Sequence, residues 1–146
     1  MAYANGELIT AALLNSMLSR NTQQGFVGTN QQTSSTTYTD LATVGPSVTI
    51  TSSGTVALVK WTAGMFSGDG TLRAGYVDFA ISGATTRAPV DASALIETAS
   101  NSGAGFRHMM EAYVAITPGT NTFTLKYRCL TGPFAFQNRL LIVVAP

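Results

Sequence analysis

The chain has 146 residues, which is enough for one domain that can hold a core without metals or disulfides. Its net charge is +1 and its 8 basic residues are scattered, so the basic surface of a nucleic-acid-binding protein is excluded. It contains no run of roughly 20 apolar residues that could span a membrane, and no N-terminal secretion signal is recognisable.

Charged residues make up only 10% of the chain, whereas hydrophobic residues make up 45%. Typical soluble domains have about 25% charged residues. The polar surface must therefore consist largely of Thr, Ser, Asn, Gln and Gly, a composition that suits β-strands and large, close-packed assemblies. The single cysteine, Cys129, has no partner for a disulfide within the chain.

A short N-terminal α-helix is predicted over residues 5–20. Asn5 is a suitable N-cap, and Glu7 and Arg20 complement the positive and negative ends of the helix dipole. The apolar stripe of this helix consists of Ile9, Leu13, Leu14, Met17 and Leu18. A helix of about 15 residues is only marginally stable alone. The stripe must therefore pack either on its own domain or on a partner, through oligomerisation or attachment.

Residues 21–35, NTQQGFVGTNQQTSS, carry no charge and few apolar side chains. This composition indicates a linker or an extended arm that follows the helix. We therefore expect an N-terminal helix and arm for attachment or oligomerisation over residues 1–35, and a β-sandwich domain over residues 36–146. Phe26 is the candidate residue for anchoring the arm in a groove of a partner.

The rest of the chain consists of short strand-like runs separated by turn signals. The predicted strands cover residues 36–41, 47–51, 56–65, 72–81, 92–97, 106–116, 121–129 and 137–144. Their regular spacing, without helical periodicity, predicts an all-β fold, an antiparallel eight-stranded jelly-roll-like β-sandwich. The last run, RLLIVV, is apolar on both faces, so we expect it to be central, or covered on its second face by the helix or a neighbouring subunit.

The segment from Glu111 to Cys129 is predicted to be an antiparallel hairpin. A turn is expected at residues 117–121, because Pro pre-sets φ and Gly accepts a positive φ. In the second strand Phe123, Leu125 and Tyr127 alternate with polar residues, which places these three side chains on the face that packs against the core.

No catalytic, metal or cofactor site is predicted. His108 is the only histidine, so a transition-metal site is not expected, and we assign His108 a structural role. Asp69 lies within a Gly-Asp-Gly sequence that has too few oxygen ligands for calcium and is typical of a turn. Trp61 is the strongest candidate for an exposed aromatic platform that could stack on a sugar. We therefore expect a protein that is not an enzyme.

Lys60, Asp78, Glu111 and Lys126 are charged residues inside predicted strands. A charge in the middle of a strand should face water or meet an opposite charge. We therefore expect outward-facing cross-strand pairs at these positions, in preference to a ligand site.

Several segments of the sequence resemble segments of small virion proteins of tailed bacteriophages. They are TSSTTYTDLATVGPSVTITSSGTVALV, VDFAISGATTRAP, AITPGTNTFTLKYR and FQNRLLIVVAP. In that family a helical segment similar to NGELITAALLNSMLSR precedes a β-sandwich, and the resemblance covers nearly the whole chain. It implies a head-decoration, minor tail or tail-fibre-like protein, commonly trimeric, and it brings no catalytic motif.

From this resemblance we expect a structural protein on the surface of the virion. The favoured role is a capsid decoration protein that forms a homotrimer and is anchored to other virion proteins, of the capsid or tail, through its N-terminal segment. The alternative is a tail-tip or tail-fibre module that binds a receptor or a host surface glycan. Its exposed binding loops would contain Arg87, Asn101 and Phe134. No nucleic acid, membrane or cofactor is expected as a partner.

Overall fold

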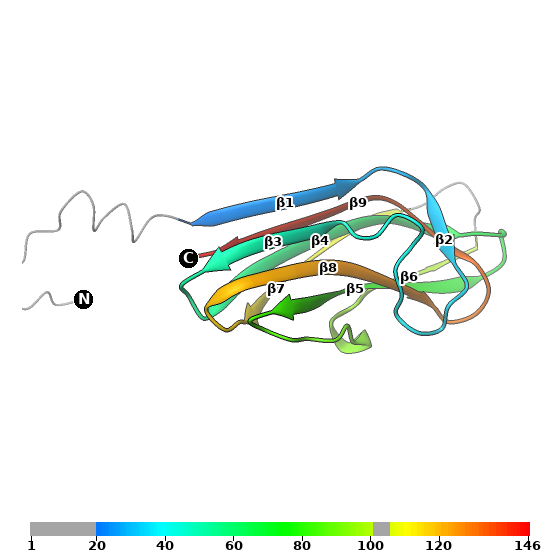
Figure 1. Cartoon of the computed structure of the whole chain (residues 1–146). Coiled ribbons are helices and arrows are strands. Elements are labelled where there is room, and N and C mark those ends of the chain that lie inside the picture. The colour runs from blue at the N-terminus through cyan, green and yellow to red at the C-terminus, as the bar shows by residue number, and fades with distance from the viewer. Residues whose placement is uncertain (1–19, 101–105) are drawn as a thin grey trace, which may run out of the picture.

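The computed structural model describes residues 20–100 and 106–146, which form two antiparallel sheets packed face to face (Figure 1). Regular structure in these residues is strand, apart from one 3-10 turn, η2 (Asp91–Ser93). The prediction of an all-β, antiparallel fold is therefore confirmed for the described part of the chain. The helix predicted over residues 5–20 lies, apart from Arg20, outside the described residues.

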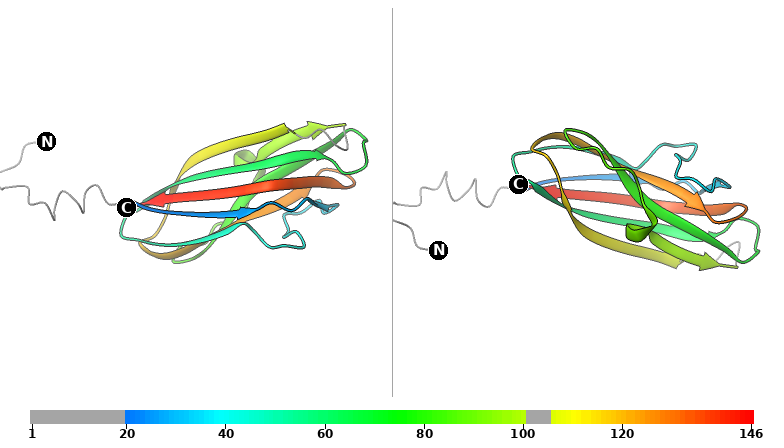
Figure 2. Two further views of the ribbon diagram at one scale, coloured as in Figure 1. Left: turned by 90° about the horizontal axis from the view of Figure 1, so that it is seen from above. Right: turned by 90° about the horizontal axis from the view of Figure 1, so that it is seen from below.

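The first sheet, sheet A, has the strand order β1-β9-β4-β7. Its strands are β1 (Asn21–Val27), β9 (Phe134–Ala145), β4 (Val56–Ser67) and β7 (Phe106–Ala115), and the short β2 (Gln31–Thr33) pairs with the start of β9. Seen from above, β9 in red lies between β1 in blue and β4 in green (Figure 2, left). The prediction that the last strand is central is confirmed.

The second sheet, sheet B, has the strand order β3-β8-β5-β6. Its strands are β3 (Ser47–Ser52), β8 (Gly119–Cys129), β5 (Arg73–Gly83) and β6 (Leu95–Ala99). Along β3 and most of β8, buried positions alternate with more exposed ones. This alternation is expected of strands that pack one face on a core and turn the other outward.

The core between the sheets is centred on Trp61 of β4. Its side chain is fully buried, its Nε1 donates a hydrogen bond to the Val77 carbonyl at 3.3 Å, and its ring meets Phe79 edge-on with centroids 5.1 Å apart. Phe123 and Tyr127 of β8 are also fully buried, as predicted for this face of the strand. The prediction of an exposed platform at Trp61 is wrong, because the residue lies on the inner face of a strand covered by sheet B.

The segment predicted to be an arm contributes strands to sheet A. β1 pairs with β9 without interruption from Asn21, opposite Ala145, to Val27, opposite Arg139. Strand pairing uses backbone N–H and C=O groups, so a segment with uncharged polar side chains can serve as well as an apolar one. By contrast, the strand predicted over residues 36–41 is limited to a single bridge in the structure.

The predicted hairpin over residues 111–129 is not formed. β7 pairs with β4 in sheet A, whereas β8 lies between β3 and β5 in sheet B. The chain crosses from one sheet to the other at residues 116–118. Alternation of apolar side chains determines which face of each strand is buried but not which strand lies beside it. The two strands were therefore predicted correctly and their pairing was not.

Candidate functional site

The outer face of sheet A carries a group of apolar side chains, which we call the apolar face; the strand register also places Gln24, Lys60, Thr62 and Glu111 among them. The register of the strands places Phe26 opposite Leu140, and Leu58 between Val144 on one side and Tyr113 on the other. The apolar face consists of Phe26, Val56, Leu58, Met109, Tyr113, Leu140, Ile142 and Val144. Single exposed apolar residues are ordinary, whereas a contiguous group of them marks an interaction site.

Two opposite charges lie within the apolar face and pair with each other. Lys60 and Glu111 are directly opposite on β4 and β7, and Nζ of Lys60 lies 2.9 Å from Oε2 of Glu111. This arrangement confirms the cross-strand pair predicted for these two residues. Nearer one end of the face, Arg107 donates to Thr62 Oγ1 at 3.2 Å and to the Asn138 carbonyl at 3.0 Å. A partner can therefore cover the centre of the face without leaving a charge unpaired.

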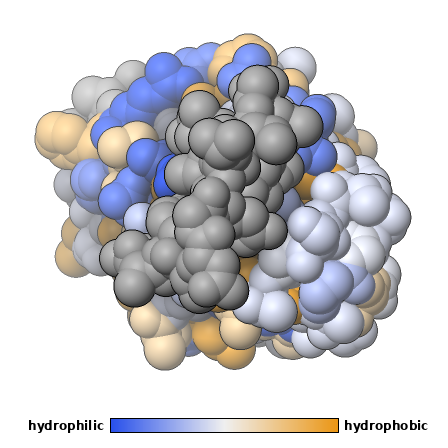
Figure 3. All heavy atoms as spheres, turned by 90° about the vertical axis from the view of Figure 1, so that its left-hand side faces the viewer, coloured by the Kyte–Doolittle hydropathy of each residue, from blue (hydrophilic) through white to orange (hydrophobic). Residues whose placement is uncertain are grey.

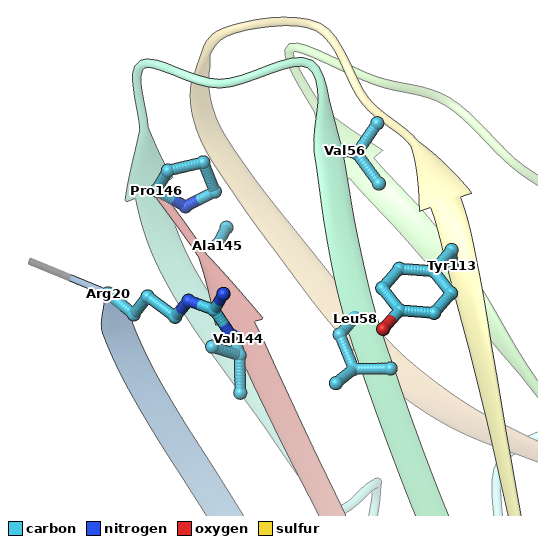
Figure 4. Close-up of a pocket in the computed structure, with 7 residues that line it drawn as sticks. All are labelled: Arg20, Val56, Leu58, Tyr113, Val144, Ala145 and Pro146. Atoms are coloured by element: carbon cyan, nitrogen blue, oxygen red, sulfur yellow. The ribbon is translucent and has the colours of Figure 1, made fainter. Parts of the chain in front are cut away.

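A shallow pocket lies at the other end of the apolar face (Figure 4). Its volume is about 280 Å³, and it is lined by Arg20, Val56, Leu58, Tyr113, Val144, Ala145 and Pro146. In Figure 4 the Arg20 side chain reaches across Val144, while the Tyr113 ring lies beside Leu58. Pockets for small molecules usually measure roughly 300–1,000 Å³ and enclose their ligand with converging polar groups. This hollow lies at the lower end of that range, and only Arg20 and Tyr113 bring polar side-chain groups to it, so it is suited to a side chain of a protein partner.

The strand β7 forms one edge of sheet A. It pairs with β4 on one side, and no strand in the described part of the chain pairs with its other side. Phe106, Met109 and Tyr113 on this strand are all exposed. A long, apolar edge strand presents unpaired backbone groups and tends to associate with other chains unless it is covered. The edge is contiguous with the apolar face, so one partner could cover both.

The outer face of sheet B is different in character, because its hydroxyl groups are paired with one another. Cross-strand hydroxyl pairs between β3 and β8, at 2.8 to 3.0 Å, are Ser47–Thr124, Thr49–Thr122 and Thr51–Thr120. In Figure 3, pale spheres of intermediate hydropathy gather at the right, the side on which β3 and β8 lie in the foreground of Figure 1. This surface is compatible with water and offers little apolar area to a partner.

A cluster of tyrosines and charges lies beyond the hydroxyl pairs on sheet B. The guanidinium carbon of Arg128 lies 3.8 Å from the Tyr76 ring centroid and 5.6 Å from that of Tyr38, and Arg128 pairs with Asp91. The Tyr38 hydroxyl donates to Asp91 Oδ1 at 3.0 Å. Hydrogen bonding from Arg128 lowers the pKa of Asp91, whereas burial and the hydrogen bond to Asp91 raise the pKa of Tyr38. Asp91 is therefore ionised and Tyr38 protonated at neutral pH.

Arg87, predicted to lie in an exposed binding loop, holds its loop against β5 instead. Its Nη2 lies 2.9 Å from Oδ2 of the fully buried Asp78, and its guanidinium also donates to the Phe79 carbonyl. The same carboxylate oxygen accepts hydrogen bonds from the Val90 backbone N–H at 2.7 Å and from Ser93 Oγ at 3.1 Å. The expectation of an exposed binding residue at Arg87 is therefore wrong. Asp78 meets an opposite charge, but this charge comes from the loop after β5 and not from a neighbouring strand, as was expected.

The remaining candidate binding and attachment residues fall into three groups. Phe134 is fully buried, with its ring centroid 5.5 Å from that of Phe136, so its assignment to an exposed loop is wrong. It is the first residue of β9 and points into the core. Phe26 is 60% exposed on the apolar face, which is compatible with contact to a partner. The candidates outside the described residues are Ile9, Leu13, Leu14, Met17, Leu18 and Asn101.

Titratable side chains elsewhere in the described residues form local pairs. Nε2 of His108 lies 2.5 Å from Oε2 of Glu97, across the edges of the two sheets. Asp69 accepts a hydrogen bond from Arg73 Nη2 at 2.6 Å, and this bond lowers the pKa of the carboxyl group. No three His, Cys, Asp or Glu side chains in residues 20–100 and 106–146 are grouped to hold a metal ion. In the same residues, no helix has the length and apolarity needed to cross a membrane.

Most of the apolar face could not be identified from local patterns. The run RLLIVV carries a signal, because its second apolar face needs a cover and supplies Leu140 and Ile142. Leu58 and Tyr113, by contrast, are ordinary members of alternating runs. They become neighbours on one surface only because β4 pairs with β7.

No protein-family model and no curated protein matches the chain. Among solved structures, it is similar to the C-terminal CBM6 of LamC, a marine laminarinase from Zobellia galactanivorans, with 13% identity over 84% of this chain and 98% of that chain and a TM-score of 0.36. It is also similar to the exo-β-1,3-galactanase of Phanerochaete chrysosporium, solved with galactose, with 17% identity over 85% of this chain and a TM-score of 0.31. The match covers only 29% of the galactanase chain. Both TM-scores are too low to support a functional inference for this chain.

Proposed function

We propose that this protein is a non-enzymatic structural subunit of a tailed-bacteriophage particle, and that it works by docking a protein against the apolar face. The observation that carries the proposal is the contrast between the two outer surfaces. Leu58, Met109 and Tyr113 lie on one of them, whereas paired Ser and Thr hydroxyls cover the other. A sandwich with one apolar and one hydrated face is suited to sit in an assembly with the apolar side turned inward.

The order of the strands supports a jelly roll as the architecture of this subunit. Apart from the short β2, the chain visits sheet A at β1, β4, β7 and β9, and sheet B at β3, β5, β6 and β8. Two four-stranded sheets connected in this way are expected of the double-sheet jelly roll, which recurs in viral capsid and lectin domains. One fold hosts many functions, so a jelly roll is compatible with a virion role without defining it.

The assignment to a phage particle rests on the sequence. The phrases VDFAISGATTRAP and AITPGTNTFTLKYR, among others, resemble small virion proteins of tailed phages. The low content of charged residues, 10%, also suits a subunit packed among others, since charge is depleted at the centre of protein interfaces. Within the particle we retain capsid decoration as the favoured role.

The test of this proposal is the composition of purified particles of the phage that encodes the chain. We expect the protein to co-purify through a density gradient at a fixed ratio to the major capsid protein, and antibody labelling to place it on the head. A mutant phage carrying Met109→Glu should assemble particles with less of the protein, whereas Ile96→Glu, on the outer face of sheet B, should not change its amount. Absence of the protein from purified particles would overturn the proposal.

A second candidate function is glycan binding, favoured by the cluster on sheet B. Tyr38 and Tyr76 supply aromatic rings, and Arg128 and Asp91 supply charged hydrogen-bonding groups beside them. Aromatic rings with adjacent polar groups suit ligands that have both apolar and hydroxyl surfaces. The same jelly roll could therefore serve as a tail module that recognises a host surface sugar.

A glycan array probed with the labelled full chain tests this second function. Specific binding that is lost in Tyr38→Ala and retained in Met109→Glu would assign recognition to the sheet B cluster. The absence of any signal above that of an unrelated β-sandwich control would remove this candidate. Binding that is lost in Met109→Glu but retained in Tyr38→Ala would contradict the assignment to this cluster.

A further inference from the structure

We propose that the free edge of β7 binds an extended segment of another protein of the particle, which joins sheet A as an additional strand. This inference rests on the proposed function, which gives the surface of sheet A a protein partner. It specifies the conformation of that partner and the groups that bind it. These groups are the backbone N–H and C=O groups of β7 that point away from β4.

β7 is the longest edge strand of the sandwich. It has 10 residues, whereas the other edge strands, β1, β3 and β6, have 7, 6 and 5. In the left view of Figure 2, β7 in yellow is the outermost strand of sheet A on the side opposite to β1 in blue. β1 and β3 also lie against each other, since a Cβ atom at Gly25 would lie 2.9 Å from the Ser47 carbonyl oxygen. Among the described residues, β7 therefore offers the longest row of unpaired backbone groups.

The antiparallel ladder with β4 determines which backbone groups of β7 are free. The Ile116 N–H, just beyond the end of β7, donates to the Thr55 carbonyl at 2.9 Å. The pairing then continues without a register shift to Phe106. In an antiparallel pair, successive residues turn their backbone groups alternately toward the partner strand and away from it. The residues whose backbone groups point to the free edge are Arg107, Met109, Glu111, Tyr113 and Ala115.

β7 lacks the features that usually keep an edge strand from pairing. Natural proteins protect such edges with short strands, Pro, bulges or charged side chains turned over the edge. β7 is long, contains no Pro and has no register shift against β4. Its backbone edge is therefore geometrically ready to accept another strand.

The charged side chains of β7 are held by partners inside the sandwich and do not guard the edge. Arg107 donates to Thr62 Oγ1 on β4 at 3.2 Å. Glu111 pairs with Lys60 on the same neighbouring strand. His108 lies against a carboxylate of β6 in sheet B. An added strand would therefore meet no unpaired charge along the middle of β7.

The inward side chains of β7 are incompletely covered. Met110, Ala112 and Val114 pack against the core but are only partly buried. They lie on the side of the sandwich where sheet B ends in the short β6. A strand added beside β7 would turn every second side chain toward this row. We therefore expect the partner segment to carry apolar residues at alternate positions.

An extended backbone fits this edge better than a helix does. A helix uses its backbone N–H and C=O groups internally, so it would cover apolar side chains and leave the edge groups of β7 unpaired. In strand addition, main-chain hydrogen bonds give the affinity and alternate side chains give the specificity. The 10 residues of β7 present an edge roughly 33 Å long, at about 3.3 Å per residue.

A second copy of the chain fits the edge less well. Its free strand of matching length is β7 itself, so the two strands would pair antiparallel about a two-fold axis. Centred on Glu111, this pairing sets two carboxylates directly opposite each other, which is destabilising. Centred on Met110, it sets each Glu111 opposite the apolar Met109. A segment of another protein is free of this constraint.

Hydrogen exchange, measured residue by residue in the free full chain and in purified particles, tests the proposal. In the free chain, the amides of Met109, Glu111 and Tyr113 should exchange fast, and those of Met110 and Ala112 slowly, because only the latter bond to β4. In particles, exchange of the first three should slow by roughly tenfold or more. Slowing at alternate amides is the signature of strand pairing.

The other outcomes overturn the proposal. Equal exchange in the free chain and in particles would show that no strand is added. Slow exchange of Met109 and Tyr113 already in the free chain would assign the edge to a second copy if dilution abolishes it, and to a segment of the same chain if dilution does not. Absence of the protein from particles overturns the proposed function and this inference together, whereas fast edge amides in particles overturn this inference alone.

Two substitutions at Tyr113 provide an independent test. Both remove the ring, but only Tyr113→Pro also removes the edge N–H. Pro is tolerated on an edge strand where the N–H would face solvent, so both variants should keep the native circular dichroism spectrum. Tyr113→Pro should be incorporated into particles roughly tenfold less than Tyr113→Ala.

Equal incorporation of Tyr113→Pro and Tyr113→Ala would overturn the proposal. A Tyr113→Pro variant that fails to fold, beside a folded Tyr113→Ala, would contradict the assignment of this N–H to the free edge.

Discussion

Lys60 and Glu111 face each other on β4 and β7 with 2.9 Å between Nζ and Oε2, on the same outer face as Leu58 and Tyr113. Both side chains are partly exposed in a single chain, so the pair contributes only about 0.2–1 kcal/mol to folding. The pair matters mainly for association, because it leaves no unpaired charge at this point of the surface that a partner has to bury. The first prediction separates these two roles.

In Glu111→Lys, two like charges stand directly opposite each other on neighbouring strands. We expect the free energy of unfolding to fall by about 1 kcal/mol or less, because water screens both charges in the monomer. Incorporation of the protein into particles should fall, because a contact over the face would bury unpaired charge. Urea unfolding measures the first effect, and the amount of the protein in purified particles measures the second.

The exchanged double variant, Lys60→Glu with Glu111→Lys, is the control, because it restores opposite charges at the same positions. It should recover incorporation into particles. If Glu111→Lys is incorporated as well as the native protein, the charge pair is irrelevant to the contact and the face is not buried there.

The second prediction concerns Arg87→Ala, which removes the partner of the fully buried Asp78 carboxylate. Breaking a buried pair by removing one member costs about 3–5 kcal/mol, because the other charge is left without compensation. The two remaining hydrogen bonds to this carboxylate, from the Val90 N–H and Ser93 Oγ, do not replace a cation, so we expect a loss near this range in urea unfolding. Chain segments around Val90 and Ser93 should also show faster hydrogen exchange, since they share the same carboxylate.

Arg73→Ala is the matched control for this prediction. Its partner Asp69 is more exposed than Asp78, so the loss should be clearly smaller than that of Arg87→Ala. An Arg87→Ala variant with native stability but altered glycan binding would restore Arg87 to its predicted role as an exposed binding residue.

The third prediction tests close packing between the sheets at Gly75. A Cβ atom added there would lie 2.2 Å from Cδ1 of Phe134, and β5 is held on both sides by β6 and β8. Gly75→Ala should therefore destabilise the fold by about 1–3 kcal/mol through overpacking. The backbone at Gly75 is not in the left-handed region, so the cost comes from packing.

A second substitution, Phe134→Leu, provides room for the new methyl group. The double variant should lose less stability than the sum of the two single variants, as expected of residues in direct contact. Additive losses, measured by urea unfolding, would show that Phe134 does not limit the space at Gly75.

The fourth prediction is a loss of stability in acid. Hydrogen bonds from Arg73 and Arg128, respectively, hold the pKa values of Asp69 and Asp91 below their ordinary value of 3.8. A carboxyl group whose pKa is lower in the folded state stabilises that state fully above its unfolded pKa. The stabilisation is then lost as the pH falls from about 4 toward the lower folded value, because the native state must take up the proton at a cost.

Urea midpoints measured between about pH 7 and about pH 3 test this behaviour. Asp69→Asn should lower the midpoint at neutral pH and flatten its dependence on pH in acid, because this position no longer titrates. An Asp69→Asn variant with the same acid slope as the native protein would show that other carboxyl groups govern acid unfolding.

Individual residues show which burial predictions the local sequence pattern could make. Phe123, Leu125 and Tyr127 were correctly placed in the core because alternation at period two is a local property of the strand. Trp61 and Phe134 were misplaced for the opposite reason. Whether an aromatic side chain is buried depends on the sheet that packs over it, and the neighbouring residues do not indicate which strands form that sheet.

In the candidate site, too, some features could be predicted from local pattern and others required the fold. The apolar second face of RLLIVV was recognised as needing a cover, whereas its extension over Leu58, Met109 and Tyr113 was not. Arg87 was selected because its loop is polar, and the structure shows it paired with a carboxylate on β5. Ion pairs between residues distant in the chain require the fold before they can be identified.

In the segment from Glu111 to Cys129, some features follow from the local residue pattern and others follow only from the packing of the two sheets. Composition and alternation were sufficient for an all-β chain, for the two strands of this segment and for the buried face of the second. The structure decided that β7 and β8 lie in different sheets, and that Asn21–Val27 completes the edge beside β9. The physical reason is that burial follows a local side-chain period, whereas pairing depends on backbone groups that are chemically alike in every strand.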